Sequence, residues 1–365
     1  MKTDIMLSIC IPTYNRSKEL KELIASVLSS KCRKFEVVVT DNLSTDDTSE
    51  VLQSIQDDRL CICQNEKPLP GLCNMIEAIF NANGKYALYC NDRDLLFAEE
   101  IERLIAFLET DEFSFVRTSQ RMAAKRAKCS NSASIFSKGY ESLMHQTHTH
   151  HPTGMVFNCE IIRKFLNKEK YFQYLPLTFT YSFLMRDLLQ YEKSAVYDYG
   201  CWAQRHPMYL QANKSGIAAD WYLPSSRQRI MEGVMIQIFK ECNFGLTKKQ
   251  SVNLARYIML YFAKNIWGYK AFMMDEYQPA HYGLKRRFIS TPEILKISHD
   301  YSNISIAFLQ ENGFPKAFVE TWEKNLPQYY LRAIRESLRS DLVMIKRNIL
   351  KVTNHLFPKT KSEIA

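Results

Sequence analysis

Hydrophobic residues in the first 110 positions alternate between strand and helix spacings. LSICIP is a short β-rich run that Pro12 ends, and a stretch with helical spacing begins at Ser17. Its apolar residues recur at i, i+3, i+4, i+7 and i+8, and they are Leu20, Leu23, Ile24, Val27 and Leu28. The pattern predicts a strand followed by a helix with one buried face.

The same alternation occurs three more times before residue 110. FEVVVT, RLCICQ and YALY are strand-type runs, and each precedes a stretch with helical spacing. Ser44 and Asp47 have capping-box spacing ahead of the second of these helices. Strands separated by single helices predict a mostly parallel sheet with right-handed crossovers, which is an α/β fold.

Polar residues follow the ends of the predicted strands. Asp92 and Asp94 stand one residue apart in NDRD, directly after the fourth strand, and Thr13, Asp41 and Asn65 lie at the ends of the others. Ligands of open α/β sheets bind outside these carboxyl ends, and paired carboxylates suit Mg²⁺ or Mn²⁺ that holds a diphosphate. A solvated turn is the alternative for Asp-x-Asp alone. Neither G-x-G-x-x-G after the first strand nor G-x-x-x-x-G-K-[ST] occurs, which disfavours dinucleotide-binding Rossmann and P-loop proteins.

Five segments, taken in order, resemble family 2 glycosyltransferases of the GT-A fold, which use a nucleotide-sugar donor and invert its anomeric centre. They are SICIPTYNR, VVVTDNLSTDDT, NEKPLPGLCNM, NDRD and HPTGMVF. The resemblance covers roughly residues 5 to 205. It implies a GT-A Rossmann-like, mostly parallel sheet flanked by helices. A helical C-terminal domain follows from the helical spacing that dominates after about residue 213.

The resemblance also implies roles for individual residues. By this resemblance, the residues that bind the nucleotide sugar are Pro12, Thr13, Tyr14, Asp41, Asn65 and Asp92. Asp41 would accept a hydrogen bond from the imide N–H of the base. The resemblance implies that Asp94 and Asp92 bind Mn²⁺ or Mg²⁺. Arg93 stands where many relatives have a further Asp, which leaves open which of the two contacts the metal, and we favour Asp94. Each assignment has a structural alternative. Asp41 could only cap the end of its strand, and Thr13 could only be a turn residue. Asp46 and Asp47 suit the negative charge favoured at a helix N-terminus better than a ligand role.

Thr153 and Gly154 resemble the Thr-Gly stretch that lines the acceptor side in the family. Asp187 is our candidate for the catalytic base, because it is the only acid between Glu169 and Glu192 and follows the Thr-Gly stretch at the expected distance. Partial burial on a helix would raise its pKa toward a useful value. A structural Asp–Arg or Asp–Lys pair is the alternative. If the segment is out of register with the family, the chain lacks a conventional base.

Histidines gather in HQTHTHHPTG, at His145, His148, His150 and His151. Zinc binding is disfavoured because no Cys pair accompanies them, so a loop that hydrogen-bonds a sugar acceptor is the better interpretation. His206 follows the last predicted sheet element, where it could reach the diphosphate or the metal; a structural histidine is the alternative.

Charge differs between the two halves of the chain, and helical spacing dominates from about residue 213 onward. Residues 1 to 110 carry 12 Lys and Arg against 18 Asp and Glu, which leaves 36 against 21 for the rest. We therefore expect a GT-A-like domain at 1–212 and a basic, helical domain at 213–365. Ten scattered cysteines, no signal peptide and no run of about 18 apolar residues favour a cytoplasmic protein. No nucleic-acid-binding motif occurs.

The C-terminal tail combines an apolar stripe with basic flanks. Leu338, Leu342, Ile345 and Ile349 advance by three or four residues, with Val352 and Leu356 beyond them. Arginines and lysines surround this stripe, which suits a helix at the inner surface of an anionic membrane. Packing of the stripe on the preceding helices is the alternative.

Together these features predict an inverting, metal-dependent enzyme that moves a hexose or N-acetylhexosamine, most simply from a UDP-sugar. The acceptor would be a saccharide or a lipid-linked saccharide in surface polysaccharide biosynthesis. Two other functions fit part of the pattern. A sugar-nucleotide pyrophosphorylase should have a Gly-rich basic loop after its first strand, and PTYNRSKEL has no glycine. A non-catalytic binding protein with this fold would fit Arg93 and a chain that lacks a conventional base.

Overall fold

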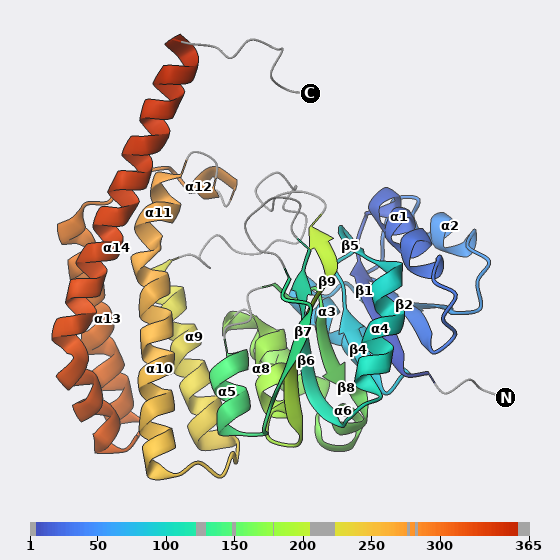
Figure 1. Ribbon diagram of the computed structural model, residues 1–365, viewed down its shortest axis with the longest axis horizontal. Helices are drawn as coiled ribbons and strands as arrows, with labels where there is room; N and C mark the ends of the chain where they lie inside the picture. The colour runs from blue at the N-terminus through green and yellow to red at the C-terminus, as the bar shows by residue number, and fades with distance from the viewer. Residues whose placement is uncertain are drawn as a thin grey trace. The chain divides into compact units, whose positions relative to one another are not determined.

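A computed structural model describes residues 5–121, 129–147, 151–177, 179–204, 223–275, 278–281 and 284–356. The described residues form two compact units (Figure 1). The first contains the chain up to residue 204 together with 236–250, and the second contains 223–235 and the residues after 250. Residues 236–250, which the sequence analysis assigned to the helical domain, thus cluster with the first unit.

The N-terminal half of the first unit alternates strands and helices, as the sequence predicts. In chain order the elements are β1 (Leu7–Thr13), α1 (Ser17–Leu28), β2 (Phe35–Asp41), α2 (Thr48–Gln53), β3 (Leu60–Gln64), α3 (Gly71–Phe80) and β4 (Tyr86–Tyr89). β1 pairs in parallel with both β2 and β4, and β2 pairs in parallel with β3. Their carboxyl ends therefore meet at one edge of the sheet, which we call the carboxyl edge.

The remaining elements extend this sheet in a less regular way. They are β5 (Asp94–Leu96), α4 (Ala98–Leu108), β6 (Phe113–Gln120), β7 (Ser132–Phe136), α5 (Tyr140–Gln146), β8 (Met155–Asn158), α6 (Cys159–Phe165), α7 (Lys168–Gln173), η1 (Leu175–Leu177), α8 (Thr180–Leu188) and β9 (Lys193–Gln204). The strand order is β3-β2-β1-β4-β8-β6-β9-β5, and β7 pairs with β9. By these pairings β1 to β4, β6 and β9 run in one direction, so the predicted α/β fold with a mostly parallel sheet is confirmed.

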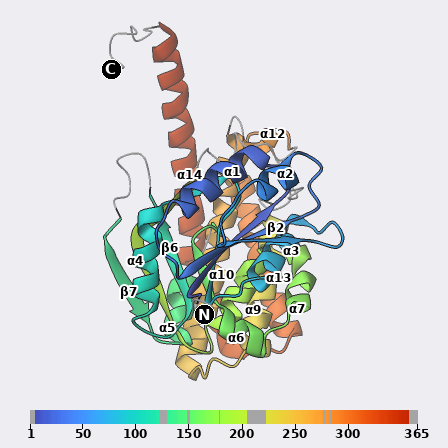
Figure 2. The ribbon, with the colours of Figure 1, turned by 90° about the vertical axis from the view of Figure 1, so that its right-hand side faces the viewer.

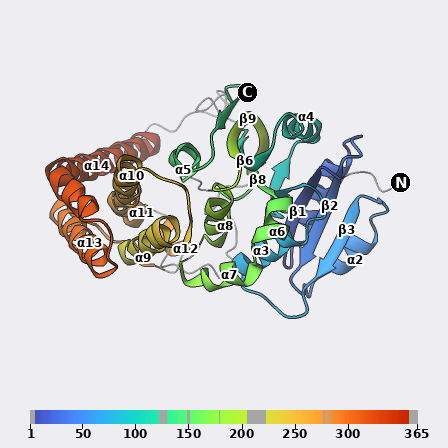
Figure 3. The same cartoon turned by 90° about the horizontal axis from the view of Figure 1, so that it is seen from below.

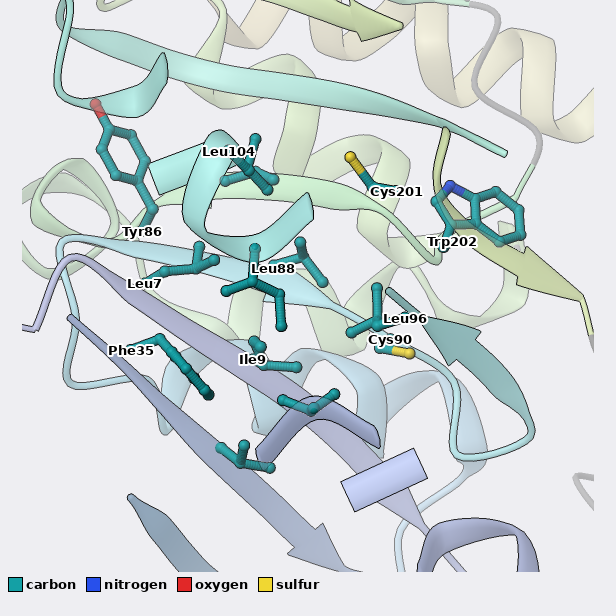
Figure 4. Close-up of a cluster of buried hydrophobic side chains, with 14 of the residues drawn as sticks. Leu7, Ile9, Phe35, Tyr86, Leu88, Cys90, Leu96, Leu104, Cys201 and Trp202 are labelled. Carbon is teal, nitrogen blue, oxygen red and sulfur yellow. The ribbon is translucent and has the colours of Figure 1, made fainter. Parts of the chain in front are cut away.

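Helices cover both faces of the sheet. α1 and α4 pack on one face, over a cluster that includes Leu7, Ile9, Leu88, Leu104 and Trp202 (Figure 4). α3 contacts β1, β2 and β4 on the other, and α4 and α7 lie on opposite sides of the strands in Figures 2 and 3. Strands buried on both faces explain why β1 and β2 are almost continuously apolar.

Strand β8 brings a distant segment to the carboxyl edge. It lies antiparallel between β4 and β6, with Leu88 opposite Val156 and Tyr86 opposite Asn158. The residues that precede β8 therefore lie beside the end of β4, although more than 60 positions separate them in the chain. The Gly154 N–H donates to the Tyr89 carbonyl at 2.9 Å, which fixes this contact.

The second unit is helical in its described residues. Its elements are most of α9 (Pro224–Ile236) and α10 (Lys248–Trp267), then α11 (Tyr269–Met274), α12 (Gln278–His281), α13 (Thr291–Glu311) and α14 (Lys316–Leu356); the π-helical turn η4 (Gln237–Glu241) belongs to the first unit. α13 and α14 pack along their length, where the Trp322 indole donates to Ser302 Oγ at 3.0 Å. None of the described helices is long and apolar enough to cross a membrane.

The C-terminal part of α14 projects beyond the other helices of this unit (Figure 1). Leu338, Leu342 and Ile345 are each more than half exposed there. The predicted alternative, in which this apolar stripe packs on the preceding helices, is therefore not what the described residues show. We call these three residues the α14 stripe.

Candidate functional site

The predicted site residues lie where their strands end. Thr13 and Asp41 are the last residues of β1 and β2, Asn65 follows β3, and Asp92 and Asp94 follow β4. Because these four strands are parallel, all five residues lie along the carboxyl edge. The antiparallel strand β8 adds Thr153 and Gly154 to the same edge.

Asp94 is the most tightly held residue of this group. Its Oδ2 accepts hydrogen bonds from Thr153 Oγ1 at 2.5 Å and from Asn91 Nδ2 at 3.0 Å. The Asn91 backbone N–H donates in turn to Thr153 Oγ1 at 3.1 Å. The other oxygen, Oδ1, is buried and has no hydrogen-bond partner among the described residues. One oxygen thus fixes the carboxylate and the other remains available for a ligand.

Asp92 lies beside Thr13 and Arg16. Thr13 Oγ1 donates to Asp92 Oδ2 at 3.1 Å, and Arg16 Nε lies 3.6 Å from Asp92 Oδ1. Burial raises the pKa of Asp92 to about 6, although Arg16, the Thr13 hydroxyl and Arg93 stabilise its charged form. An incoming cation would oppose that effect of burial.

Asp41 is engaged by two neighbouring polar residues. The Ser44 hydroxyl donates to Asp41 Oδ1 at 2.5 Å, the Ser44 backbone N–H at 3.1 Å, and Gln64 Nε2 reaches Oδ2 at 3.3 Å. The predicted capping box of Ser44 and Asp47 is wrong, since Ser44 bonds to Asp41 and the Asp47 side chain caps no N–H of α2. Asp46 accepts from the Thr48 N–H at 3.1 Å instead, in keeping with a helix N-terminal charge.

Asn65 belongs to a cluster of asparagines that shapes the turn after β3. Its Nδ2 donates to Asn42 Oδ1 and to Asn74 Oδ1, both at 2.8 Å. Asn42 also bonds the backbone of Leu69 in both directions at 2.8 Å. Through these contacts Asn65 fixes the conformation of the turn that follows β3 at the carboxyl edge. Tyr14, just beyond β1, is 41% exposed.

The sequence analysis gave no role to Asn91 or Trp202, which help to build the site, and named His151 only as one of a run of histidines. Asn91 holds both Asp94 and Thr153, as described above. His151 stacks on Trp202 with ring centroids 4.6 Å apart, and its Nε2 lies 3.7 Å from Asp94 Oδ2. Asn91 directly precedes the Asp-x-Asp motif, and the histidine run includes His151, but no local pattern signals that β9 brings Trp202 to this place.

His151 is neutral in this setting at pH 7, because burial lowers its pKa more than the nearby Asp94 raises it. Its Nδ1 accepts the Thr153 N–H at 3.3 Å, which leaves the proton on Nε2, the atom that faces Asp94. Of the other histidines singled out in the sequence, His145 stacks on Phe136, and His148, His150 and His206 lie outside the described residues.

The donor set of the carboxyl edge fits a hard divalent cation. An orphaned buried carboxylate oxygen on Asp94 is what a Mg²⁺ or Mn²⁺ ligand requires, and Asp92 supplies a second carboxylate two residues away. Within the described ranges no group of three His, Cys, Asp or Glu side chains forms a metal cluster. Water and diphosphate oxygens would have to complete the coordination, which is usual for Mg²⁺.

Asp187 lies apart from these residues. It is 1% exposed, and its oxygens accept from Lys170 Nζ at 2.9 Å, Tyr171 OH at 2.7 Å, Gln237 Nε2 at 2.8 Å and Cys242 Sγ at 3.1 Å. These partners come from α7, from η4 and from the residue after η4, and none of them is at the carboxyl edge. The contacts are those of a buried structural Asp–Lys pair.

The direction of α8 explains this position. α8 begins beside α3, where Thr180 Oγ1 donates to the Leu72 carbonyl at 3.3 Å. Asp187 follows seven residues later, about 10 Å along the axis. The chain then enters β9 at Lys193, at the amino end of a strand that runs with β1. The geometry places Asp187 toward the opposite edge of the sheet, so its assignment as the base stays a prediction and the structural pair is the better-supported alternative.

Comparison with known proteins fits this architecture. Residues 8–168 match the family model described as glycosyl transferase family 2. This part of the chain is therefore similar to family 2 glycosyltransferases. An uncharacterised glycosyltransferase of Rickettsia felis is 35% identical over 127 residues, which are 34% of this chain and 21% of that protein.

A second relative has an assigned reaction. The UDP-Glc:α-D-GlcNAc-diphosphoundecaprenol β-1,3-glucosyltransferase WfaP of Escherichia coli is 30% identical over 112 residues, 30% of this chain and 44% of that enzyme. Among solved structures, S. aureus TarS 1–349 in complex with UDP aligns with a TM-score of 0.55 at 15% identity, over 89% of this chain and 92% of that one. The latter likeness shows the fold, since the sequences are too different to show more.

The matches to these sequence relatives cover less than half of each relative's length. The matched stretches are about a third of this chain. The helical second unit lies outside the range of the family match.

Gly154 gives a direct test of how tightly the carboxyl edge is packed. Its φ is +88°, and an added Cβ would lie 2.3 Å from Thr118 Oγ1 and 2.4 Å from Trp202 Nε1. Gly154→Ala should therefore cost about 2 kcal/mol or more of unfolding free energy, measured by urea denaturation, through backbone strain and overpacking together. Gly245→Ala is the matched control, because its φ is +60° and no atom lies within 4 Å of the added Cβ. Equal losses in the two variants would show that the packing around Gly154 is loose.

Proposed function

We propose that the protein is an inverting glycosyltransferase that moves a hexose or N-acetylhexosamine from a UDP-sugar to a lipid-linked saccharide. The observation that carries the proposal is the unpartnered, buried Oδ1 of Asp94, held beside Asp92 and Thr13 at the edge where parallel α/β sheets bind ligands. The similarity to family 2 glycosyltransferases and the printed donor of the E. coli relative support the same reaction.

The nucleoside would lie over the ends of β1 and β2. Tyr14 offers an exposed aromatic ring to the base, beside Pro12. Asp41 would accept the imide N–H of a uracil. A carboxylate has about four acceptor sites, and the three donors from Ser44 and Gln64 leave room for one more hydrogen bond. Thr13 and Asp92 would hold the ribose.

The diphosphate would lie next to Asp94. A divalent cation held by Asp94 and Asp92 would neutralise the diphosphate and so make it a better leaving group. The chain's own contribution is to fix the Asp94 carboxylate through Thr153 and Asn91. Thr153 is buried, so it acts here by positioning Asp94. The neighbouring His151, whose Nε2 lies 3.7 Å from Asp94 Oδ2, would meet an acceptor on that side.

The acceptor proposal rests on the E. coli relative, whose printed acceptor is a diphosphoundecaprenol-linked sugar. A saccharide bound to such a lipid is met at a membrane surface. The exposed α14 stripe offers a means of attachment, because its apolar side chains could enter the headgroup region. We propose on this basis that the protein acts in surface polysaccharide biosynthesis at the inner face of the cell membrane.

Donor identity can be tested by thermal shift with UDP-, GDP-, dTDP- and CMP-sugars, with and without Mn²⁺. We expect selective stabilisation by a UDP-sugar, and a larger shift when Mn²⁺ is present, because a ligand that binds the native state raises its melting temperature. A response to CMP-sugars alone, or to no nucleotide, would contradict the donor proposal.

Asp94→Asn should reduce turnover at least about a hundredfold, on the order of 3 kcal/mol, because the leaving diphosphate would lose its counter-ion in the transition state. The variant keeps an oxygen for Thr153 and Asn91, so its melting temperature should change little. The measurement is UDP release in the presence of an acceptor. Asp47→Asn is the control, since Asp47 is an exposed carboxylate near the same edge. Steady UDP release by the unmodified protein would also exclude a non-catalytic binding protein.

Asp187 is tested by comparison with its ion-pair partner. Asp187→Asn and Lys170→Met should each lower the unfolding free energy by about 1–3 kcal/mol. The first sets an amide NH₂ against one of the donors that now bond Asp187, and the second removes the cation that pairs with this buried carboxylate. At a temperature where both variants are folded, we expect both to retain transfer, as a structural pair requires. Transfer lost in Asp187→Asn and kept in Lys170→Met would instead identify Asp187 as the base.

A further inference from the structure

The second unit contains a basic cleft that the transfer reaction does not use. Its volume is about 1010 Å³, at the upper end of the range of ligand pockets. α10, α11 and α14 line most of it, with one residue from α9, and all of the lining residues belong to the second unit. Its position therefore does not depend on how the two units are placed.

Positive charge dominates the walls of this cleft. Five cationic side chains line it, namely Arg227, Lys264, Arg332, Arg335 and Arg339. The lining contains two acids, Asp275 and Glu336. Glu336 lies 3.8 Å from Arg339, whereas Lys264, Arg332 and Arg335 form no ion pair with any described carboxylate. The excess charge suits an anionic ligand.

The arginines are carried on a helix that is anchored from its other side. Arg332, Arg335 and Arg339 follow one another at spacings of three and four, so they share a face of α14. Lys270 of α11 is completely buried, and its ammonium donates to Asp341 at 2.7 Å and to Ser337 at 3.0 Å. This buried ion pair fixes the rotation of α14 and holds the arginine face toward the cleft.

An exposed apolar surface adjoins the basic cleft. Val343 and Met344 line the cleft, and Val343 is 46% exposed. Helical spacing puts the α14 stripe on the face next to the arginines. A ligand that combines a phosphate with apolar chains would satisfy both features, whereas a free nucleotide or inorganic phosphate would leave the stripe in water.

We propose that the basic cleft binds the headgroup phosphate of an anionic membrane phospholipid while the α14 stripe enters the same leaflet. Arginine suits this role because its planar guanidinium bonds phosphate oxygens in pairs. The inference rests on the membrane attachment proposed above and adds to it a site that selects the charge of the lipid. The helical unit then discriminates between membrane surfaces independently of the donor site.

The test is co-sedimentation of the full chain with vesicles of phosphatidylcholine alone or mixed with phosphatidylglycerol. Unmodified protein should prefer the anionic vesicles. Arg332→Gln with Arg335→Gln should weaken that binding about 30-fold, as expected for two cations at a lipid surface. Lys296→Gln with Lys324→Gln is the matched control, since both lysines are exposed helical residues outside the cleft, and it should change binding far less. Equal losses in the two pairs would overturn the site in favour of general charge attraction.

Two further experiments measure the contribution of the apolar stripe to binding and distinguish a lipid phosphate from a free phosphate. Leu338→Gln with Leu342→Gln should weaken binding to both kinds of vesicle, and Ile135→Gln with Ile304→Gln, which alter equally exposed residues elsewhere, should not. Glycerol phosphate at the lipid's phosphate concentration should fail to displace the protein; displacement would show a site for free phosphate and overturn the proposal.

The donor thermal shift, which involves no lipid, separates this inference from the proposed reaction. Binding to neither vesicle, with the UDP-sugar response intact, would overturn the lipid site and leave the transferase proposal standing. Circular dichroism melts of all variants would show that they are folded, as substitutions of exposed residues allow.

Discussion

The candidate site depends on one constraint, which is that Asp94 is fixed through one carboxylate oxygen while the other, although buried, keeps no hydrogen-bond partner among the described residues. Thr153 and Asn91 meet this constraint together, because both bond Oδ2 and neither reaches Oδ1. A buried carboxylate oxygen without a partner is costly, so the fold must compensate for it elsewhere. The two hydrogen bonds on Oδ2 and the surrounding sheet supply that compensation until a ligand arrives.

The antiparallel strand β8 makes this arrangement achievable. An all-parallel sheet would bring only strand ends to the carboxyl edge, but β8 begins there and so delivers Thr153 beside the end of β4. Gly154 is needed at that point because the indole of Trp202 passes where a Cβ would be. The same strand order leaves the end of α8, and with it Asp187, toward the other edge of the sheet.

The second unit uses a buried ion pair for a different purpose. Breaking the pair of Lys270 and Asp341 would leave a buried charge without compensation, which makes it a strong constraint on the orientation of α14. Because the packed face of α14 is fixed in this way, its arginines and its apolar stripe remain at the surface. The ion pair inside the unit thus determines that the arginines and the α14 stripe lie on its surface.

The sequence by itself determined the α/β architecture, the ends of the first four strands and the Asp-x-Asp turn, because two hydrophobic periods and strand-end polar residues are local signals. It also marked the α14 stripe as amphipathic, but it could not show whether that stripe is packed or exposed. Only the tertiary structure decided that Asn91, Thr153 and His151 surround Asp94 and that Asp187 is enclosed by Lys170 and its neighbours. Such contacts join residues far apart in the chain through strand order and helix direction, and neither of these leaves a periodic trace in the sequence.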